Sequence, residues 1–493
     1  MRRIALLAVS VLLATLAGCG GTAQPGSGAA EVVPAGVPVF ASVDTDFDGD
    51  QWTQVEELIR RFPAGAEALD DFLAGLATEE GLDFEQDVKP ALGPETGLVV
   101  LEFDPADEEP PFVVLTQPRD PAKLQELLEK SSNSGVSEEF EGWTLLAEKQ
   151  ESLDRFKELA AGGDKLADSD AWSRAMDGLP EDALATAFFD AEALRGALES
   201  DPSAQEQFEL LFPGGELPAI GAVLRAEDDG ARLEGRVAFE ERPEGLWSPA
   251  YEAQLPEEVP DGVLFYVSFN DLEQQFSQFR DALAGSNPEF DRQLAQAEGF
   301  LGVSIEEDVA PLFSGEGALY ARRGGLIPEL TLLLEVEDEQ KAVDTVDEIV
   351  KVVGGYEPRV GEPQDVEIAG VQAREVPLGD VPFSLFYAGF DGRLVVTMSR
   401  EGIADLREDG DRFSDSEAFS QAKELAGMPD ETVGFLYADL QEIIPYILGI
   451  AGLSGGEVPP EVEANLEPLQ QLIVYGSEEE NVLRFAAFLG IAE

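Results

Sequence analysis

An internal duplication constrains the fold of this chain more than any other feature of the sequence. Four blocks occur twice, in the same order and at similar spacing: 34–42 with 260–268, 81–98 with 302–319, 141–153 with 391–403, and 168–173 with 415–420. Self-similarity on this scale indicates one domain plan used twice. We expect a first repeat at 34–245, a Pro-rich linker at 246–259 and a second repeat at 260–493.

Each copy alternates strand patterns with helix patterns. Asp50 is the expected N-cap of a helix at 51–62. In the first copy the expected strands cover 37–43, 97–103, 111–116, 143–147, 183–189, 219–225 and 232–239, and the other expected helices cover 120–130, 152–160 and 191–198. Because hairpins dominate, we expect an α+β fold: two tandem duplicated domains, each a mainly antiparallel sheet with packed helices.

The N-terminus has the pattern of an exported, lipid-anchored protein. Two arginines precede an apolar stretch of about 13 residues, which is too short to span a bilayer as a helix. The stretch ends in Leu-Ala-Gly before Cys19, which resembles the lipobox of bacterial lipoproteins. We therefore expect a signal peptide at 1–18, a lipid on Cys19 and a flexible Gly/Ser/Pro-containing tether over 19–33. The expected location is the extracytoplasmic face of the cell membrane.

Composition excludes several classes of function. The 493 residues hold 100 Asp and Glu against 32 Lys and Arg, a net charge of −68, which would repel a phosphate backbone, so nucleic-acid partners are not expected. The chain has no histidine and one cysteine, which rules out imidazole-dependent catalysis, an intrachain disulfide and any multi-cysteine zinc site. No cofactor is required, and any chemistry would depend on carboxylates or hard cations.

The block order, the Asp-Val-x-Pro segments at 87–90 and 308–311, and the lipobox together resemble the actinobacterial exported lipoproteins of the domain-of-unknown-function 3352 family. The resemblance covers about residues 34–491. It implies a membrane-tethered exported protein, and it supplies no activity, catalytic residue or ligand.

The sharpest candidate site is the acidic run that contains Asp44, Asp46, Asp48 and Asp50, with Gly49 at the turn. Oxygens at loop positions 1, 3 and 5 and a glycine at position 6 are what an EF-hand-type loop offers to calcium. Position 12 is Val55, however, where such a loop has a bidentate glutamate. The alternative is a solvated acidic turn whose last aspartate caps a helix.

Other candidate motifs have plain structural alternatives. Ser420 and Lys423 have the Ser-x-x-Lys spacing of penicillin-binding enzymes, but the accompanying motifs are absent, and this spacing arises easily on a polar helix. The two Asp-Val-x-Pro segments favour a structural duty, such as capping a turn before a strand, over a catalytic one. Carboxylates are too frequent for any single pair to be specific, and we assign no catalytic residue.

The apolar run at 443–453 is too short to span a membrane. It is either a buried helix of the second repeat or a mobile flap over an apolar groove. Three functions remain open: a non-enzymatic binding or structural module of the envelope, a carrier or chaperone for a lipid-like ligand, and a carboxylate-dependent hydrolase of wall glycans. The partners are therefore the membrane, through the anchor, and either an apolar ligand or an envelope protein; the oligomeric state stays open.

Overall fold

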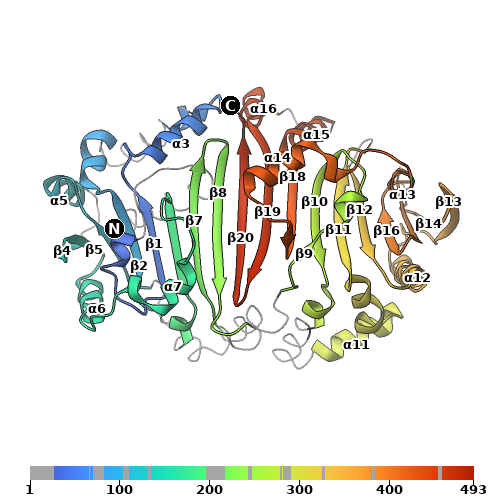
Figure 1. Ribbon diagram of the computed structural model, residues 1–493, viewed down its shortest axis with the longest axis horizontal. Helices are drawn as coiled ribbons and strands as arrows, with labels where there is room; N and C mark the ends of the chain where they lie inside the picture. The colour runs from blue at the N-terminus through green and yellow to red at the C-terminus, as the bar shows by residue number, and fades with distance from the viewer. Residues whose placement is uncertain are drawn as a thin grey trace.

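The computed structural model describes residues 27–65, 67–69, 83–103, 110–130, 135–195, 217–242, 247–277, 280, 290–324, 328–379, 383–453 and 458–492. Within these parts, 18 strands form one sheet in which neighbouring strands are hydrogen-bonded (Figure 1). Helices pack on the sheet, so the expected α+β class with an antiparallel sheet is confirmed. Residues 1–18 and Cys19 lie outside the described residues.

The first repeat provides one half of the sheet. Its strands are β1 (Val39–Asp44), β2 (Glu95–Val100), β3 (Phe112–Thr116), β4 (Val136–Phe140), β5 (Trp143–Ala147), β6 (Ala185–Asp190), β7 (Ala219–Glu227) and β8 (Gly230–Ala238). Its helices and helical turns are α2 (Ser27–Ala30), α3 (Asp50–Arg60), η1 (Phe84–Val88), η2 (Lys89–Ala91), α5 (Pro121–Lys130), α6 (Gln150–Ala160), η3 (Leu166–Asp168), α7 (Asp170–Met176) and η4 (Glu192–Leu194).

The second repeat provides the other half. Its strands are β10 (Val263–Asn270), β11 (Glu316–Arg322), β12 (Glu329–Glu335), β13 (Gln364–Ile368), β14 (Val371–Pro377), β15 (Ser384–Phe390), β16 (Arg393–Thr397), β18 (Gly434–Asp439), β19 (Leu469–Glu479) and β20 (Val482–Ile491), and β9 (Tyr251–Glu252) pairs with β17 (Glu431–Thr432) in a small separate sheet. Its helices and helical turns are η5 (Leu255–Glu257), α11 (Phe290–Leu301), η6 (Ile305–Val309), η7 (Ala310–Phe313), α12 (Glu339–Tyr356), α13 (Glu401–Arg407), η8 (Phe413–Asp415), α14 (Glu417–Ala426), α15 (Leu440–Leu453) and α16 (Pro460–Leu466).

The strand order shows how the duplication is built. The first repeat reads β4-β5-β3-β2-β1-β6-β7-β8 from its outer edge inward. The second repeat reads β15-β16-β12-β11-β10-β18-β19-β20 in the same sense, with the hairpin β13–β14 added outside β15. Every pairing is antiparallel, so the two repeats share one topology.

The two repeats meet along a single seam, the antiparallel pair β8–β20. In this pair Gly230 lies opposite Gly490, and Ala238 lies opposite Val482. Gly230 and Val482 occupy equivalent places, because each opens the second strand of its hairpin. Each repeat therefore presents the same strand to the other, which is the geometry of a two-fold axis.

Helices of both repeats cover one face of the sheet, which we call the helical face. The core beneath them includes Phe156 of α6 and Ala175 of α7 in the first repeat, and Ile403 of α13 and Phe419 of α14 in the second. Figure 1 shows α7 and α14 lying in front of the central strands. On the opposite face, α5 with η1 and η2 covers the outer strands of the first repeat, and α12 with η7 covers those of the second.

Two predicted segment boundaries differ from the structure. Residues 27–33, which we assigned to the tether, form α2 and a turn, and Ala29 and Val33 are fully buried in the first core. In the predicted linker, Leu255 of η5 is likewise buried in the second core. These short helices precede β1 and β10, so each repeat begins earlier in the sequence than the repeated blocks at 34–42 and 260–268 suggested.

Close packing of α7 on β7 gives a test of the helical face. A Cβ atom on Gly221 would lie 2.3 Å from the carbonyl oxygen of Ala175, so we expect Gly221→Ala to lower the free energy of unfolding by ~1–3 kcal/mol. Gly410→Ala is the control, since nothing lies within 4 Å of its added Cβ, and its effect should stay within about 0.5 kcal/mol. Urea unfolding of both variants measures the difference. Equal stabilities would contradict this packing.

Candidate functional site

The acidic run at the end of β1 lies against two basic side chains. Asp44 is fully buried, and one of its carboxylate oxygens accepts a hydrogen bond of 2.7 Å from the backbone N–H of Asp46. Asp46 forms an ion pair with Arg119. Asp48 lies 2.8 Å from the ammonium of Lys89, and this hydrogen bond lowers the pKa of the Asp48 carboxyl.

Asp50 does not cap the helix that follows. Gly49 is the N-cap of α3, and Asp50 is the first residue inside the helix. This corrects the predicted capping role, although a carboxylate in the first turn still interacts favourably with the helix dipole. Within the described part of the chain, no three Asp, Glu, His or Cys side chains gather as a group that could hold a metal ion. Calcium at Asp44, Asp46, Asp48 and Asp50 stays a prediction.

The two Asp-Val-x-Pro segments make the same hydrogen bond in both repeats. The Asp87 carboxylate accepts from the backbone N–H of Asp83 at 2.9 Å, and the Asp308 carboxylate accepts from that of Ser304 at 2.9 Å. Each bond closes a five-residue π-helical turn, η1 or η6. Each carboxylate therefore caps the start of a helical turn, and these turns precede β2 and β11.

Ser420 and Lys423 both lie on α14. Ser420 is exposed. The Lys423 ammonium lies 3.9 Å from the Asp430 carboxylate and 5.9 Å from the centre of the Phe419 ring. Both contacts are those of a surface lysine.

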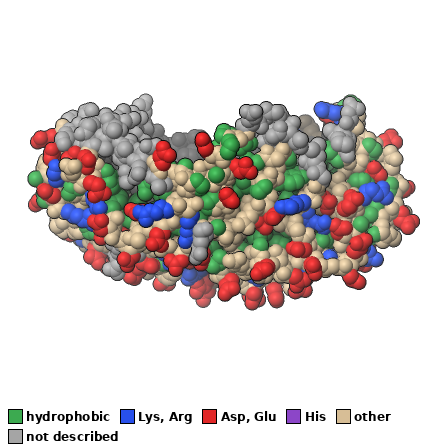
Figure 2. Space-filling view, turned by 90° about the horizontal axis from the view of Figure 1, so that it is seen from above, with side chains coloured by type: hydrophobic (Ala, Val, Ile, Leu, Met, Phe, Trp, Pro, Cys, Tyr) green, Lys and Arg blue, Asp and Glu red, His purple; other side chains and the backbone are tan. Residues whose placement is uncertain are grey.

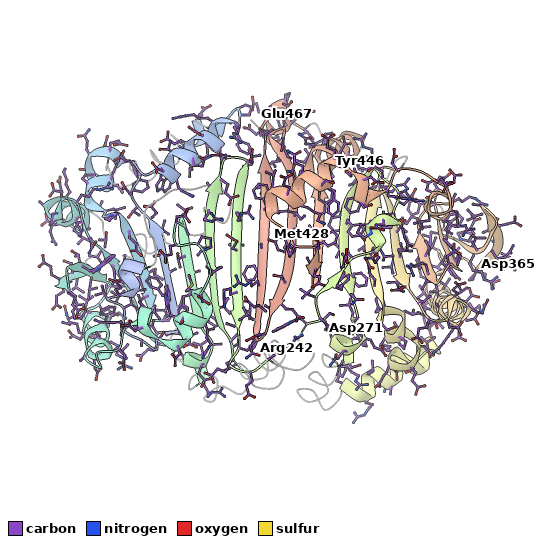
Figure 3. The ribbon with its side chains drawn as sticks, in the orientation of Figure 1. Arg242, Asp271, Asp365, Met428, Tyr446 and Glu467 are labelled. Atoms are coloured by element: carbon purple, nitrogen blue, oxygen red, sulfur yellow. The ribbon has the colours of Figure 1, made fainter. Side chains whose placement is uncertain are left out.

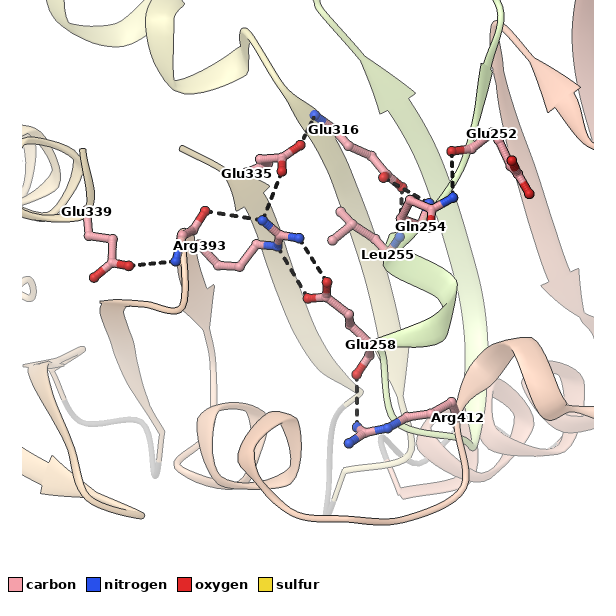
Figure 4. A network of polar contacts seen from close by, with 10 residues as sticks. Glu252, Gln254, Leu255, Glu258, Glu316, Glu335, Glu339, Arg393 and Arg412 are labelled. Atoms are coloured by element: carbon pink, nitrogen blue, oxygen red, sulfur yellow. Dashed lines mark hydrogen bonds and ion pairs between the residues drawn. The ribbon is translucent and has the colours of Figure 1, made fainter. Parts of the chain in front are cut away.

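Several carboxylates gather around Arg393, in the network of Figure 4. Arg393 donates to Glu335 at 3.1 Å and to Glu258 at 2.8 Å. Burial raises the pKa of Glu316, yet its two oxygens accept hydrogen bonds of 2.9 Å from the backbone N–H groups of Gln254 and Leu255. The carboxylates of this network therefore hold η5 against the sheet.

The apolar run at 443–453 forms the greater part of α15. In its described part, 440–450, no side chain is buried, and Ile447 is 57% exposed. The helix packs on β18, β19 and β10, and an ion pair between Arg323 and Glu442 ties it to the end of β11. The expected buried helix is therefore a half-exposed one. Of the helices that the structure describes, none has both the length and the hydrophobicity to cross a membrane.

The largest unexplained feature is the centre of the face opposite the helical face. Strand residues alternate between the two faces. Arg232 and Arg236 contact helices of the helical face, so Leu233 and Val237 lie on the opposite face. Their neighbours on the adjacent strands continue the same surface. We call it the apolar window; it comprises Ala187, Phe189, Ile220, Ala222, Leu224, Leu233, Val237, Leu483, Phe485, Ala487, Leu489, Leu472, Val474, Leu436, Phe265, Val267 and Leu319.

These side chains are partly exposed rather than buried. All are half-buried except Ala187, which is exposed. The window crosses the seam without interruption, because Phe485 lies over Gly235, where an added Cβ atom would come within 2.1 Å of its ring. Figure 2, which looks along the strands, shows a crescent that is hollowed on the side away from α7 and α14. Asp and Glu side chains crowd the opposite, convex side.

Charged groups lie only at the rims of the window, within the strands that form it. At one end Glu478 pairs with Arg242 at 2.9 Å and accepts a hydrogen bond of 2.9 Å from the Trp247 indole. At the other end lies α15 with Tyr446, and Figure 3 shows Arg242 and Tyr446 at opposite ends of the central strands. A ligand on this surface would therefore meet hydrocarbon along the strands and polar groups only at their ends.

Comparison with known proteins identifies a family. The model described as "Protein of unknown function (DUF3352)" matches residues 3–153 and 140–491. The chain belongs to this family. The match in two segments agrees with the tandem repeats of the sheet. No curated protein and no solved structure matches the chain significantly.

The apolar window was not predicted from the sequence, because the residue pattern of β8 is misleading. Apolar residues alternate with Arg232, Glu234 and Arg236, which ordinarily predicts that the apolar side is buried and the charged side faces water. The structure departs from this assignment at Arg236, which is 5% exposed beneath α7, whereas Leu233 and Val237 on the apolar side stay partly exposed. The Arg-x-x-x-Arg spacing of Arg232 and Arg236 was a clue. Nothing in the local sequence shows, however, that these side chains donate to carbonyl groups at the ends of two helices.

The ion pairs of the acidic turn give a test of calcium binding. Because Lys89 and Arg119 supply positive charge to Asp48 and Asp46, we expect Lys89→Met with Arg119→Met to strengthen calcium binding at this turn. Millimolar calcium should then raise the melting temperature of this variant more than that of the unchanged chain. The control adds Asp46→Asn and Asp48→Asn to the double variant. Equal shifts in the variant and its control would contradict a calcium site here.

Proposed function

We propose that this protein is exported, is held at the extracytoplasmic face of the membrane by a lipid on Cys19, and binds an apolar molecule on the window. The proposed role is non-enzymatic binding. It joins two of the functions that the sequence allows, an envelope binding module and a carrier of a lipid-like ligand. The observation that carries it is the uninterrupted apolar window at the centre of the sheet.

Physical chemistry favours a binding role for such a surface. Each Å² of apolar surface removed from water contributes about 25 cal/mol, so leaving a large apolar face partly exposed forgoes stabilisation of the folded protein. Contiguous apolar patches that persist on a soluble surface mark sites for ligands, partners or membranes. The window is apolar although the chain contains 100 Asp and Glu residues and has a net charge of −68.

The described carboxylates support binding over hydrolysis. A glycosidase needs two carboxyl groups that face a shared cleft, with one held protonated. Burial raises the pKa of Glu316, but backbone N–H groups occupy its oxygens, and Arg393 holds Glu258 and Glu335. These groups stabilise the fold, so the hydrolase is the least favoured of the three functions.

The anchor supports the same role from the sequence. A lipid on Cys19 followed by a short tether would keep the window near a source of apolar molecules without inserting the folded part into the bilayer. The acidic surface would keep the body away from an anionic leaflet.

Fractionation of the native host tests the anchor. We expect the full chain in the membrane fraction, and Cys19→Ala in the soluble fraction or as an uncleaved precursor, because the thioether acceptor is lost. Immunoblotting of both fractions measures the split. A processed Cys19→Ala chain that stays in the membrane would show that another element anchors the protein.

Fluorescence of Nile red, an uncharged apolar dye, tests the window. We expect Leu233→Glu to weaken dye binding about ten-fold or more, because it places a charge among half-buried apolar side chains. Val353→Glu on α12 is the matched control, since Val353 is apolar and 41% exposed, and α12 packs on β15 and β16 outside the window. Equal dye binding by the two variants, with melting temperatures alike, would exclude the window as the site.

A further inference from the structure

We propose that the occupant of the apolar window is one uncharged lipid with more hydrocarbon than a single acyl chain, lying across both repeats. This inference rests on the proposed function and specifies its ligand. Three observations carry it: the length of the window, its continuity across the seam, and the distribution of charge around it.

The window is longer than one acyl chain. It runs over eight neighbouring strands, β6-β7-β8-β20-β19-β18-β10-β11. At ~4.8 Å between strands this is roughly 33 Å, whereas the ~30 Å hydrocarbon core of a bilayer accommodates two acyl chains end to end. A fatty acid would cover about half of the window and leave the rest in water.

Continuity across the seam favours one ligand over two. The two-fold arrangement of the repeats by itself predicts two equivalent small sites, one on each side of β8–β20. Leu233 and Phe485 hold equivalent places in the two repeats and lie on adjacent strands, with Phe485 directly opposite Gly235. No polar side chain stands between them, so one hydrocarbon surface runs from one repeat into the other.

The charged groups around the window favour an uncharged headgroup. In the described part of the window no Lys or Arg side chain faces the ligand. Arg61 and Arg242, near its ends, already donate to backbone carbonyls or to Glu478. Arg323, near α15, is paired with Glu442. An anionic head would find no unpaired cation among these groups and would enter the field of a body with net charge −68. An uncharged ester or alcohol avoids both costs.

The test uses the chain from Gly20 to Glu493, which contains every described residue. The probes are fluorescent trioleoylglycerol, oleate and dioleoylphosphatidylglycerol, each titrated at low and high salt, with stoichiometry from native mass spectrometry. We expect one trioleoylglycerol per chain, and the two anionic probes to bind about ten-fold more weakly at low salt, with the gap narrowing as salt screens the repulsion.

Variants in each repeat test the shared site. Leu233→Glu and Phe485→Glu should each abolish binding of the whole ligand, whereas Val353→Glu should not. Ala187→Trp, which fills the exposed edge of the window without adding charge, should weaken the long ligand and guards against a folding defect in the glutamate variants. Melting temperatures accompany every titration.

The outcomes separate this inference from the proposed function. Tight binding of oleate or phosphatidylglycerol at low salt would overturn the uncharged headgroup and leave apolar binding intact. Two ligands per chain, each lost with one variant only, would overturn the shared site. If no probe binds and the chain instead dimerises in a way that Leu233→Glu abolishes, the window is an interface between copies, and the proposed function fails as well.

Discussion

Nine backbone pairs between β8 and β20 hold the two repeats together in register. Without them each repeat would end in an unpaired edge strand, which invites association with other chains. The seam also joins the helical layers. Arg232 of the first repeat donates to the last carbonyls of α14 in the second, and Arg484 of the second lies beside Gly178, just past the end of α7 in the first. Glu227 and Glu479 pair with these arginines in equivalent ways, so the clamp is reciprocal.

The same pairing creates the window. Because side chains alternate along a strand, a strand whose charged residues reach up to helix C-termini must present its other residues on the opposite face. On that opposite face α5 and α12 cover the outer strands, and α3 packs on Ala226 of β7 and Ile491 of β20 at the ends of the central strands. The window spans both repeats because β8 pairs with β20, and a single repeat could form only half of it.

Local patterns were sufficient for the repeated elements. The strand pattern at 143–147 and the helix pattern at 152–160 predicted β5 and α6 to within two residues. The repeated Asp-Val-x-Pro segments predicted a cap that both repeats contain. Local patterns could not predict the seam, because β8 and β20 are far apart in the sequence and nothing in either strand indicates which strand it pairs with. The length of the tether was overestimated for a related reason: Ala29 and Val33 look like linker residues until Glu95, which accepts from the N–H of Ala29, is seen beside them.

The site shows why charge and hydrophobicity must be considered together. An apolar face this wide would ordinarily drive association of copies, since burial against a second chain removes the same area from water. A body with net charge −68, with acidic side chains crowding its convex side, opposes that association through long-range repulsion, whereas a small uncharged molecule feels none of it. The acidity noted in the composition is then more than a solvated surface. If the window binds a ligand as proposed, this charge would favour a small uncharged occupant over a second acidic chain, without any polar group on the window itself.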